Sequence, residues 1–173
     1  KIIKKEDIVI NPESKIVLSK KGEVAKIHLA YSQEYFNKQN PFDFYYPKIK
    51  KLLTDRKHVL FGHAIQSDFS YLNIACRRYN LPAIEMEGYD TQKLHHLIYK
   101  TPHIESLEKI VEELEIEKDF LYHKSSEDAH ATMLVAKRIF EEYELDFATF
   151  KDKYSDCLVK NVCPKPKEKN ISR

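Results

Sequence analysis

The sequence predicts an α/β fold, and three observations carry this prediction. Residues 59–62 form a short apolar run that ends at Gly62, which is typical of a buried strand. The apolar positions Phe69, Leu72 and Cys76 then recur at helical spacing until Pro82 ends the pattern. Hydrophobic residues make up 42% and charged residues 32% of the 173 positions, which is enough apolar material for one buried core. We therefore expect strands and helices to alternate in a single folded unit.

The chain before residue 59 predicts three weaker elements. Isoleucines and Val9 surround a charged centre in residues 1–10, which indicates a strand or hairpin arm that ends at the Asn11-Pro12 turn. Residues 24–29 suit another short extended piece. Residues 41–54 carry apolar side chains at helical spacing, and the charged residues 55–57 predict the turn that ends this helix.

The chain after Pro82 predicts one further strand and three helices. Residues 84–89 are expected to form the strand, and Asp90-Thr91 can cap the helix that follows it. Thr101-Pro102 breaks that helix, and Ser106 can cap the next one. The last and longest helix has an apolar stripe that we expect to face the core, formed by Ala129, Met133, Ala136, Phe140 and Tyr143.

Composition predicts where the folded domain ends. Residues 1–150 are assigned to the domain, and residues 151–173 to a basic, flexible tail, because the sequence turns polar and lysine-rich after Phe150. A formal net charge of +2 favours no class of partner. No apolar run is long enough to span a bilayer, so we expect no membrane association and a cytoplasmic location.

Cysteine and histidine spacing argues against a zinc centre. The three cysteines have no paired spacing, and Cys76 is expected in the core as a reduced thiol. His95, His96 and His103 lack matching cysteines or carboxylates, so we expect surface histidines.

Two segments could carry chemistry, and each places a histidine five residues before an aspartate. His63 leaves the predicted strand 59–62 and Asp68 enters the first turn of the next helix, at the strand end where open α/β sheets hold their sites. His123 lies in a predicted loop and Asp128 near the start of the last helix. A loop histidine beside a helix-anchored carboxylate can act as a base next to a metal ligand. Each segment taken alone is equally consistent with an ordinary helix start.

The two segments in order resemble a known enzyme family. Residues 59–63, Asp68-Phe69, Tyr89-Asp90-Thr91, Ser106-Leu107 and His123 with Asp128-Ala129 are together similar to the motifs of the DnaQ-like exonucleases, the DEDD nucleases with a histidine in their last motif (DEDDh). The resemblance implies an RNase H-like fold, with a mixed sheet flanked by helices. It also implies removal of nucleotides from the 3′ end of single-stranded DNA or RNA with two Mg²⁺ or Mn²⁺ ions, and a polymerase or another replication or repair protein as a partner.

The resemblance assigns roles to individual residues. Asp68 and Asp128 match the metal-binding aspartates of the second and last motifs, and His123 matches the general base. His63 matches a histidine that supports the site without binding metal, and Asp90 an aspartate that organises the following helix. Two-metal hydrolysis fits such residues, because Mg²⁺ prefers oxygen ligands and two ions about 4 Å apart can stabilise both the attacking and the leaving oxygen. We therefore expect the carboxylates of Asp68 and Asp128 within about 8 Å of each other.

The chain departs from the family at its first motif. No apolar strand before Asp68 carries the Asp-x-Glu pair, and Ala64 stands where the family has asparagine. We expect the Asp-x-Glu strand in a segment upstream of Lys1, and we expect the 173 residues alone to bind divalent metal weakly and to cleave single strands little. Two alternatives are an inactive scaffold of the same fold that binds nucleic acid or protein, and a small interaction domain with no nucleic-acid role.

Overall fold

The computed structural model describes residues 2, 4–17, 29–117 and 124–162. Its helices and strands follow one another in the order α1 (Gln33–Asn37), α2 (Phe42–Leu53), β1 (Phe61–Gly62), α3 (Ile65–Arg78), β2 (Met86–Asp90), α4 (Thr91–Tyr99), α5 (Leu107–Glu113), α6 (Ser125–Glu142), α7 (Phe147–Lys153), a 3-10 turn at Ser155–Cys157, and β3 (Leu158–Asn161). None of the helices in these ranges is both long and apolar enough to cross a membrane.

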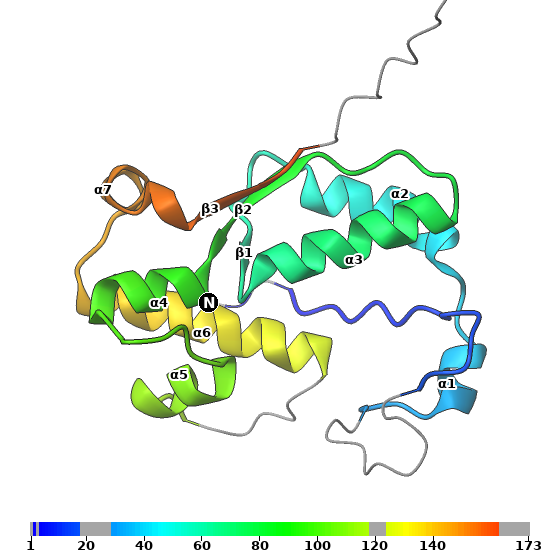
Figure 1. Ribbon diagram of the computed structural model, residues 1–173, viewed down its shortest axis with the longest axis horizontal. Coiled ribbons are helices and arrows are strands. Elements are labelled where there is room, and N and C mark those ends of the chain that lie inside the picture. Colours follow the sequence, from blue (N-terminus) through cyan, green and yellow to red (C-terminus); the bar gives the residue numbers. More distant parts are fainter. Residues whose placement is uncertain (1, 3, 18–28, 118–123, 163–173) are drawn as a thin grey trace, which may run out of the picture.

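The three strands form a mixed sheet in the order β1-β2-β3 (Figure 1). β1 pairs in parallel with β2, with Phe61 opposite Tyr89, and β3 runs antiparallel to β2, with Val159 opposite Gly88. The expected α/β class is therefore confirmed. The parallel pair follows from the α3 connection, since parallel neighbours need a crossover, usually a helix.

The sheet separates two apolar cores, which gives three layers. Alternate side chains of a strand point to opposite faces, so Met86 joins the core beneath α2 and α3 while Tyr89 joins the core beneath α4 to α7. Phe69 fills the first core, and Leu94 and Phe150 are completely buried in the second. Figure 1 shows α2 and α3 together on one side of the strands and α4, α5 and α6 on the other.

Two glycines let α3 lie close to the sheet. A Cβ on Gly62 would stand 2.7 Å from Ile65 Cγ1, and a Cβ on Gly88 would stand 2.7 Å from Ile65 Cδ1. Ile65 is the first residue of α3 and is only 3% exposed. The start of α3, and with it Asp68, is therefore seated directly against β1 and β2.

Most element predictions after residue 41 are confirmed, but the expectation for the C-terminus is wrong. Residues 151–162 are not a tail: they contain the end of α7, the 3-10 turn and β3. Cys157 and Val159 are buried there, so these apolar side chains belong to the two cores despite the lysine-rich composition around them. The rest of the predicted tail, residues 163–173, lies outside the described residues.

The buried face of α6 also differs from the predicted stripe. Of the predicted stripe, Ala136 is buried and Phe140 packs against the core, but Met133 is 37% and Tyr143 40% exposed. Val135 and Ile139, which are not in that stripe, have no exposed surface. The second apolar stripe of the helix faces the core, because α4 and α5 pack on that side.

Two expectations near the N-terminus have different outcomes. Residues 4–17 contain no strand or helix, so the predicted strand in this part is wrong within the described residues. The extended piece expected at residues 24–29 lies, up to residue 28, outside the described residues. Helix α2 is confirmed within a residue of its predicted bounds.

Candidate active site

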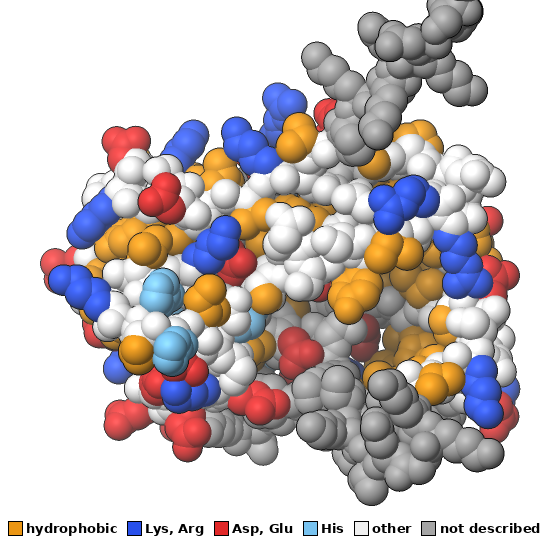
Figure 2. All heavy atoms as spheres, viewed as in Figure 1, with side chains coloured by type: hydrophobic (Ala, Val, Ile, Leu, Met, Phe, Trp, Pro, Cys, Tyr) orange, Lys and Arg blue, Asp and Glu red, His pale blue; other side chains and the backbone are white. Residues whose placement is uncertain are grey.

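A cavity of about 580 Å³ lies at the carboxyl end of β1, among the N-terminal ends of three helices. Phe61, Gly62 and His63 form its wall at the sheet, and Asp68 comes from the first turn of α3. The remaining lining residues come from the starts of α5 and α6: Ser106, Leu107, Glu108, Ser125, Asp128, Ala129 and Thr132. Figure 2 shows acidic side chains gathered near the middle of this face, between α3 and α6.

Asp68 and Asp128 line this same cavity although 60 positions separate them in the sequence. Asp68 is fixed by the seating of Ile65 on the glycines, and Asp128 belongs to the first turn of α6. Thr132 Oγ1 donates to the carbonyl oxygen of Asp128 at 2.8 Å, one helical turn further along α6. The structure thus brings together the two carboxylates that the sequence singles out, while the separation of their oxygens remains a prediction.

The environment of Asp68 is unfavourable for its own negative charge. Desolvation at the cavity wall raises the pKa of Asp68, and the nearby charge of Asp90 raises this pKa further. A carboxylate in such surroundings gains from a bound cation, because the cation offsets both the desolvation and the repulsion.

Asp90 organises the sheet end as expected. Its Oδ1 accepts hydrogen bonds from the backbone N–H groups of Ala64 at 3.1 Å and Gln92 at 2.9 Å. Ala64 has a left-handed φ of 52°. Asparagine, which stands at this position in the family that the sequence resembles, adopts this conformation more readily than alanine does. Asp90 is 3% exposed, so this buried carboxylate joins the start of α3 to the start of α4.

His63 lies in the cavity wall and contacts the buried residue Thr91. Its Nδ1 is 3.4 Å from Thr91 Oγ1, and its Nε2 is buried without a hydrogen-bond partner among the described residues. Burial lowers the pKa of His63, although the charge of Asp90 and the carbonyl of Glu105 act in the opposite direction. The lowered pKa favours the neutral form of His63, which suits the supporting role that the resemblance implies.

His95 is not the surface residue that the sequence predicts. It is 1% exposed, its Nε2 lies 3.3 Å from a Glu113 oxygen, and its Nδ1 has no partner among the described residues. Burial lowers the pKa of His95, and Glu113 opposes this effect. His95 is four residues after Thr91 on the buried face of α4, and its burial depends on how α4 packs against its neighbours, which the local sequence does not reveal.

The third predicted site residue, His123, lies outside the described residues. Glu108 lines the cavity but was not predicted. The sequence does place Glu108 directly after Ser106-Leu107, in the first turn of a predicted helix. Acidic residues are common in the first turn of any helix, so this position did not indicate a site.

The donor chemistry of the cavity fits divalent cations in part. Carboxylate oxygens are the ligands that Mg²⁺ and Mn²⁺ prefer, and Asp68 and Asp128 supply them from two helices. Across the described ranges, no group of three or more His, Cys, Asp or Glu side chains is placed so that it could hold a metal ion. These ranges therefore contain two candidate ligands rather than a full coordination sphere.

A protein family matches the chain, whereas the other comparisons give no match. No curated protein and no solved structure matches the chain. The family described as "DNA polymerase III subunit epsilon-like, C-terminal domain" matches residues 17–139, which include Asp68, His123 and Asp128. Because this match covers most of the chain, the protein belongs to the DEDDh family of DNA polymerase III epsilon-like C-terminal domains.

Proposed function

We propose that the protein is a metal-dependent 3′-5′ exonuclease with an RNase H-like fold. The observation that carries this proposal is the shared cavity of Asp68 and Asp128, found in a chain of the epsilon-like DEDDh family. A volume of about 580 Å³ lies in the range of small-ligand pockets and can hold one nucleotide. The substrate is the 3′ end of single-stranded DNA or RNA, and a polymerase or another replication or repair protein is the proposed partner.

Each residue has a proposed task. Asp68 and Asp128 hold divalent cations, which when bound stabilise charge on the phosphate and its leaving oxygen. His123 takes the proton from the attacking water, and His63 shapes the cavity wall. Asp90 keeps the starts of α3 and α4 in register, so that Asp68 keeps its place.

The other cation ligands are proposed to come from a strand beside β1. In the part of the chain that the structure describes, β1 has a strand neighbour only on its β2 side. Backbone groups of Phe61 on its other side can pair with a further strand, since alternate residues of a parallel ladder bond in opposite directions. Acidic side chains on such a strand would enter the cavity beside Asp68.

The test is release of nucleotides from a 3′-labelled single strand in the presence of Mg²⁺ or Mn²⁺. We expect little cleavage by the 173-residue chain and EDTA-sensitive cleavage by a version extended upstream. In the extended protein, Asp68→Ala or Asp128→Ala should abolish cleavage, and His123→Ala should slow it about 10²-fold, as loss of a general base does.

Two outcomes would contradict the proposal. Full activity of the Asp68→Ala and Asp128→Ala variants would show that the cavity is not the active site. An extended protein that binds oligonucleotide without cleaving it would support the inactive scaffold instead.

A further inference from the structure

The segment 4–17, called the arm below, crosses from α6 to the far end of α3. In Figure 1 it runs between α3 and α6 before the chain turns toward α1. Ile10 packs against the core beneath α2 and α3, so part of the arm is anchored by apolar contact. No residue of the arm belongs to a helix or strand, so side chains and single backbone groups hold it in place.

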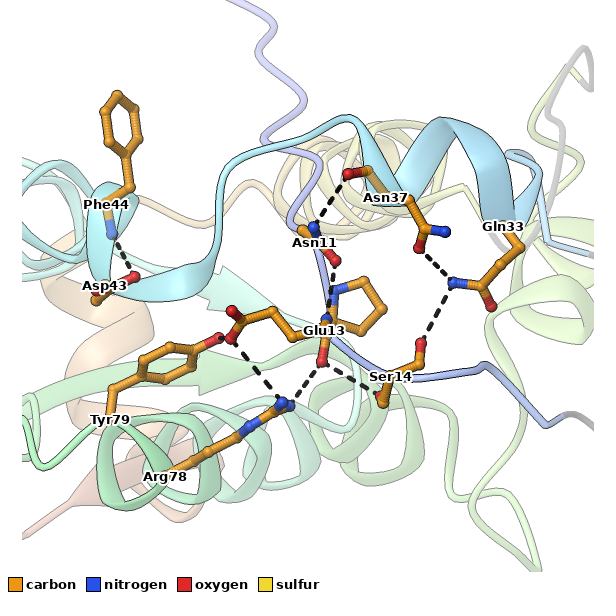
Figure 3. A network of polar contacts seen from close by, with 10 residues as sticks. Asn11, Glu13, Ser14, Gln33, Asn37, Asp43, Phe44, Arg78 and Tyr79 are labelled. Atoms are coloured by element: carbon orange, nitrogen blue, oxygen red, sulfur yellow. Dashed lines mark hydrogen bonds and ion pairs between the residues drawn. The ribbon is translucent and has the colours of Figure 1, made fainter.

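The far end of the arm is fixed to α1, α2 and α3 by several hydrogen bonds. Arg78 at the end of α3 donates to the carbonyl of Pro12 at 2.7 Å, and Tyr79 donates to the carboxylate of Glu13. The backbone N–H of Asn11 donates to the carbonyl of Asn40 at 2.9 Å, just before α2. Figure 3 shows the contacts of Arg78 and Tyr79 with the arm, together with those of Gln33 and Asn37 of α1 with the same stretch. This end of the arm is therefore a fixed point relative to the helix that carries Asp68.

The near end of the arm reaches the helix that carries Asp128. Lys5 Nζ lies 2.8 Å from Glu127 Oε1, across 122 positions of sequence, and the Glu127 side chain is only 18% exposed. The next residue, Glu6, is paired with Lys48 of α2. Asp7 accepts a hydrogen bond from Tyr31 at 2.8 Å. Three consecutive arm residues thus bind three different parts of the molecule.

The first turn of α6 is less deeply buried than the rest of the helix, although Ser126 is buried there and the backbone N–H groups of Glu127 and Asp128 donate to the carbonyl of Lys124. Its N-cap, Lys124, makes no side-chain cap hydrogen bond, and the completely buried residues Ala131, Val135 and Ile139 all lie further along the helix. Glu127 and Asp128 are adjacent in this turn, so a contact that holds the Glu127 side chain also restricts the backbone position of Asp128.

We propose that Lys5 is a positioning residue, which acts through Glu127 to hold Asp128 at the cavity in register with Asp68. This inference rests on the proposed function, since it concerns the geometry of the same metal site. The arm joins the two helices that carry the carboxylates, and Lys5 makes the contact on the α6 side. Because a partly exposed ion pair contributes little to stability, loss of the pair should weaken cation binding by up to about five-fold without unfolding the chain.

The test measures Mn²⁺ affinity of the full 173-residue chain by electron paramagnetic resonance, together with amide chemical shifts and hydrogen exchange in α6. Glu127→Gln and Lys5→Glu should each weaken Mn²⁺ binding and shift the amide resonances of Asp128 and Ala129. The matched control is Glu141→Gln, which removes the ion pair of Lys137 and Glu141 (3.5 Å) on the same helix. The double variant Lys5→Glu/Glu127→Lys should recover part of the affinity, although a lysine in the first turn opposes the helix dipole.

The outcomes separate this proposal from the proposed function. Wild-type affinity and unchanged Asp128 shifts in Glu127→Gln would overturn the role of Lys5 and leave the metal site intact. Absence of any Mn²⁺ binding in the wild-type chain would count against the metal site, and the amide shifts and exchange rates of the α6 first turn would still decide whether Lys5 positions Asp128. Equal losses in Glu127→Gln and Glu141→Gln would also contradict the proposal, because the effect would then be one of overall charge.

Discussion

Three residues near this end of the sheet have features that lower the stability of the folded protein. Ala64 takes a left-handed conformation so that its N–H can reach Asp90, and His63 and His95 both have a buried ring nitrogen without a partner among the described residues. Such features oppose folding and persist where the surrounding structure fixes them. Two of these residues, His63 and Ala64, directly follow β1 at the edge of the cavity that Asp68 lines.

The buried histidines predict that the protein is less stable in mild acid. Because burial lowers the folded-state pKa of His95, the unfolded chain takes up a proton at His95 more readily than the folded chain does as the pH falls through about 6.5. The free energy of unfolding should therefore fall as the pH drops from 7.5 to 5.5, by at most about 1.4 kcal/mol per pH unit for each such histidine. Urea unfolding at both values should show a smaller fall for His95→Gln than for the wild type.

The control for this experiment is His103→Gln, since His103 is exposed. This variant should keep the wild-type dependence on pH. If His95→Gln also keeps it, then His95 accepts its proton in the folded protein and the account of its burial is wrong.

At the scale of elements, the site depends on how closely α3 lies against the sheet. Ile65 fills the space above Gly62 and Gly88, and Asp68 follows three residues later in the same turn. The sequence predicted β1, α3, β2 and α4 because each has a local signal: an apolar run, a helical period, a proline stop or an Asp-Thr cap. It did not predict β3, because Leu158 and Val159 gain their strand conformation only by pairing with Tyr89 and Gly88.

The buried face of helix α6 likewise depends on packing that the local sequence does not specify. Its sequence carries two apolar stripes, and nothing local distinguishes the one with Met133 from the one with Val135 and Ile139. The choice is made by α5, whose Ile110 and Val111 are completely buried in the same core. The start of α6 was predictable from the run Ser125, Ser126, Glu127, Asp128, and that start is what brings Asp128 to the cavity.

Because α3 lies so close to the sheet, adding one methyl group at Gly88 should clearly lower the stability of the protein. Gly88→Ala would place a Cβ 2.7 Å from Ile65 Cδ1 and 3.1 Å from the carbonyl oxygen of Leu60. Because Ile65 is buried and cannot move into solvent, we expect a loss of about 1–3 kcal/mol in the free energy of unfolding, measured with urea. Adding Ile65→Val, which removes Cδ1, should restore part of this loss.

The matched measurement is Ile65→Val alone, which should cost about 0.5–1.5 kcal/mol. A double-mutant cycle then gives the coupling between the two positions. Strictly additive effects would mean that the glycine does not serve the approach of α3.

At the scale of the whole molecule, a three-layer fold gathers helix N-termini from separate stretches of sequence at one end of β1. Asp68, Glu108 and Asp128 come from α3, α5 and α6, and all three side chains line one cavity. The family motifs predicted two of these residues in advance. Glu108 and the burial of His95 could not be predicted, since both depend on how α4 and α5 pack together in space.

The central claim is that Asp68 and Asp128 act on the same cation, and paramagnetic relaxation by Mn²⁺ tests it most directly. Mn²⁺ added to the isotopically labelled 173-residue chain should broaden the resonances of Asp68 and Asp128 together, and at lower concentrations than those of the exposed residues Asp55 and Glu144. The measurement suits the weak binding that we expect for the chain alone. Asp68→Asn should abolish the broadening at Asp128, and Asp128→Asn the broadening at Asp68. Broadening of one aspartate that survives replacement of the other, or broadening centred elsewhere on the molecule, would contradict a shared metal site.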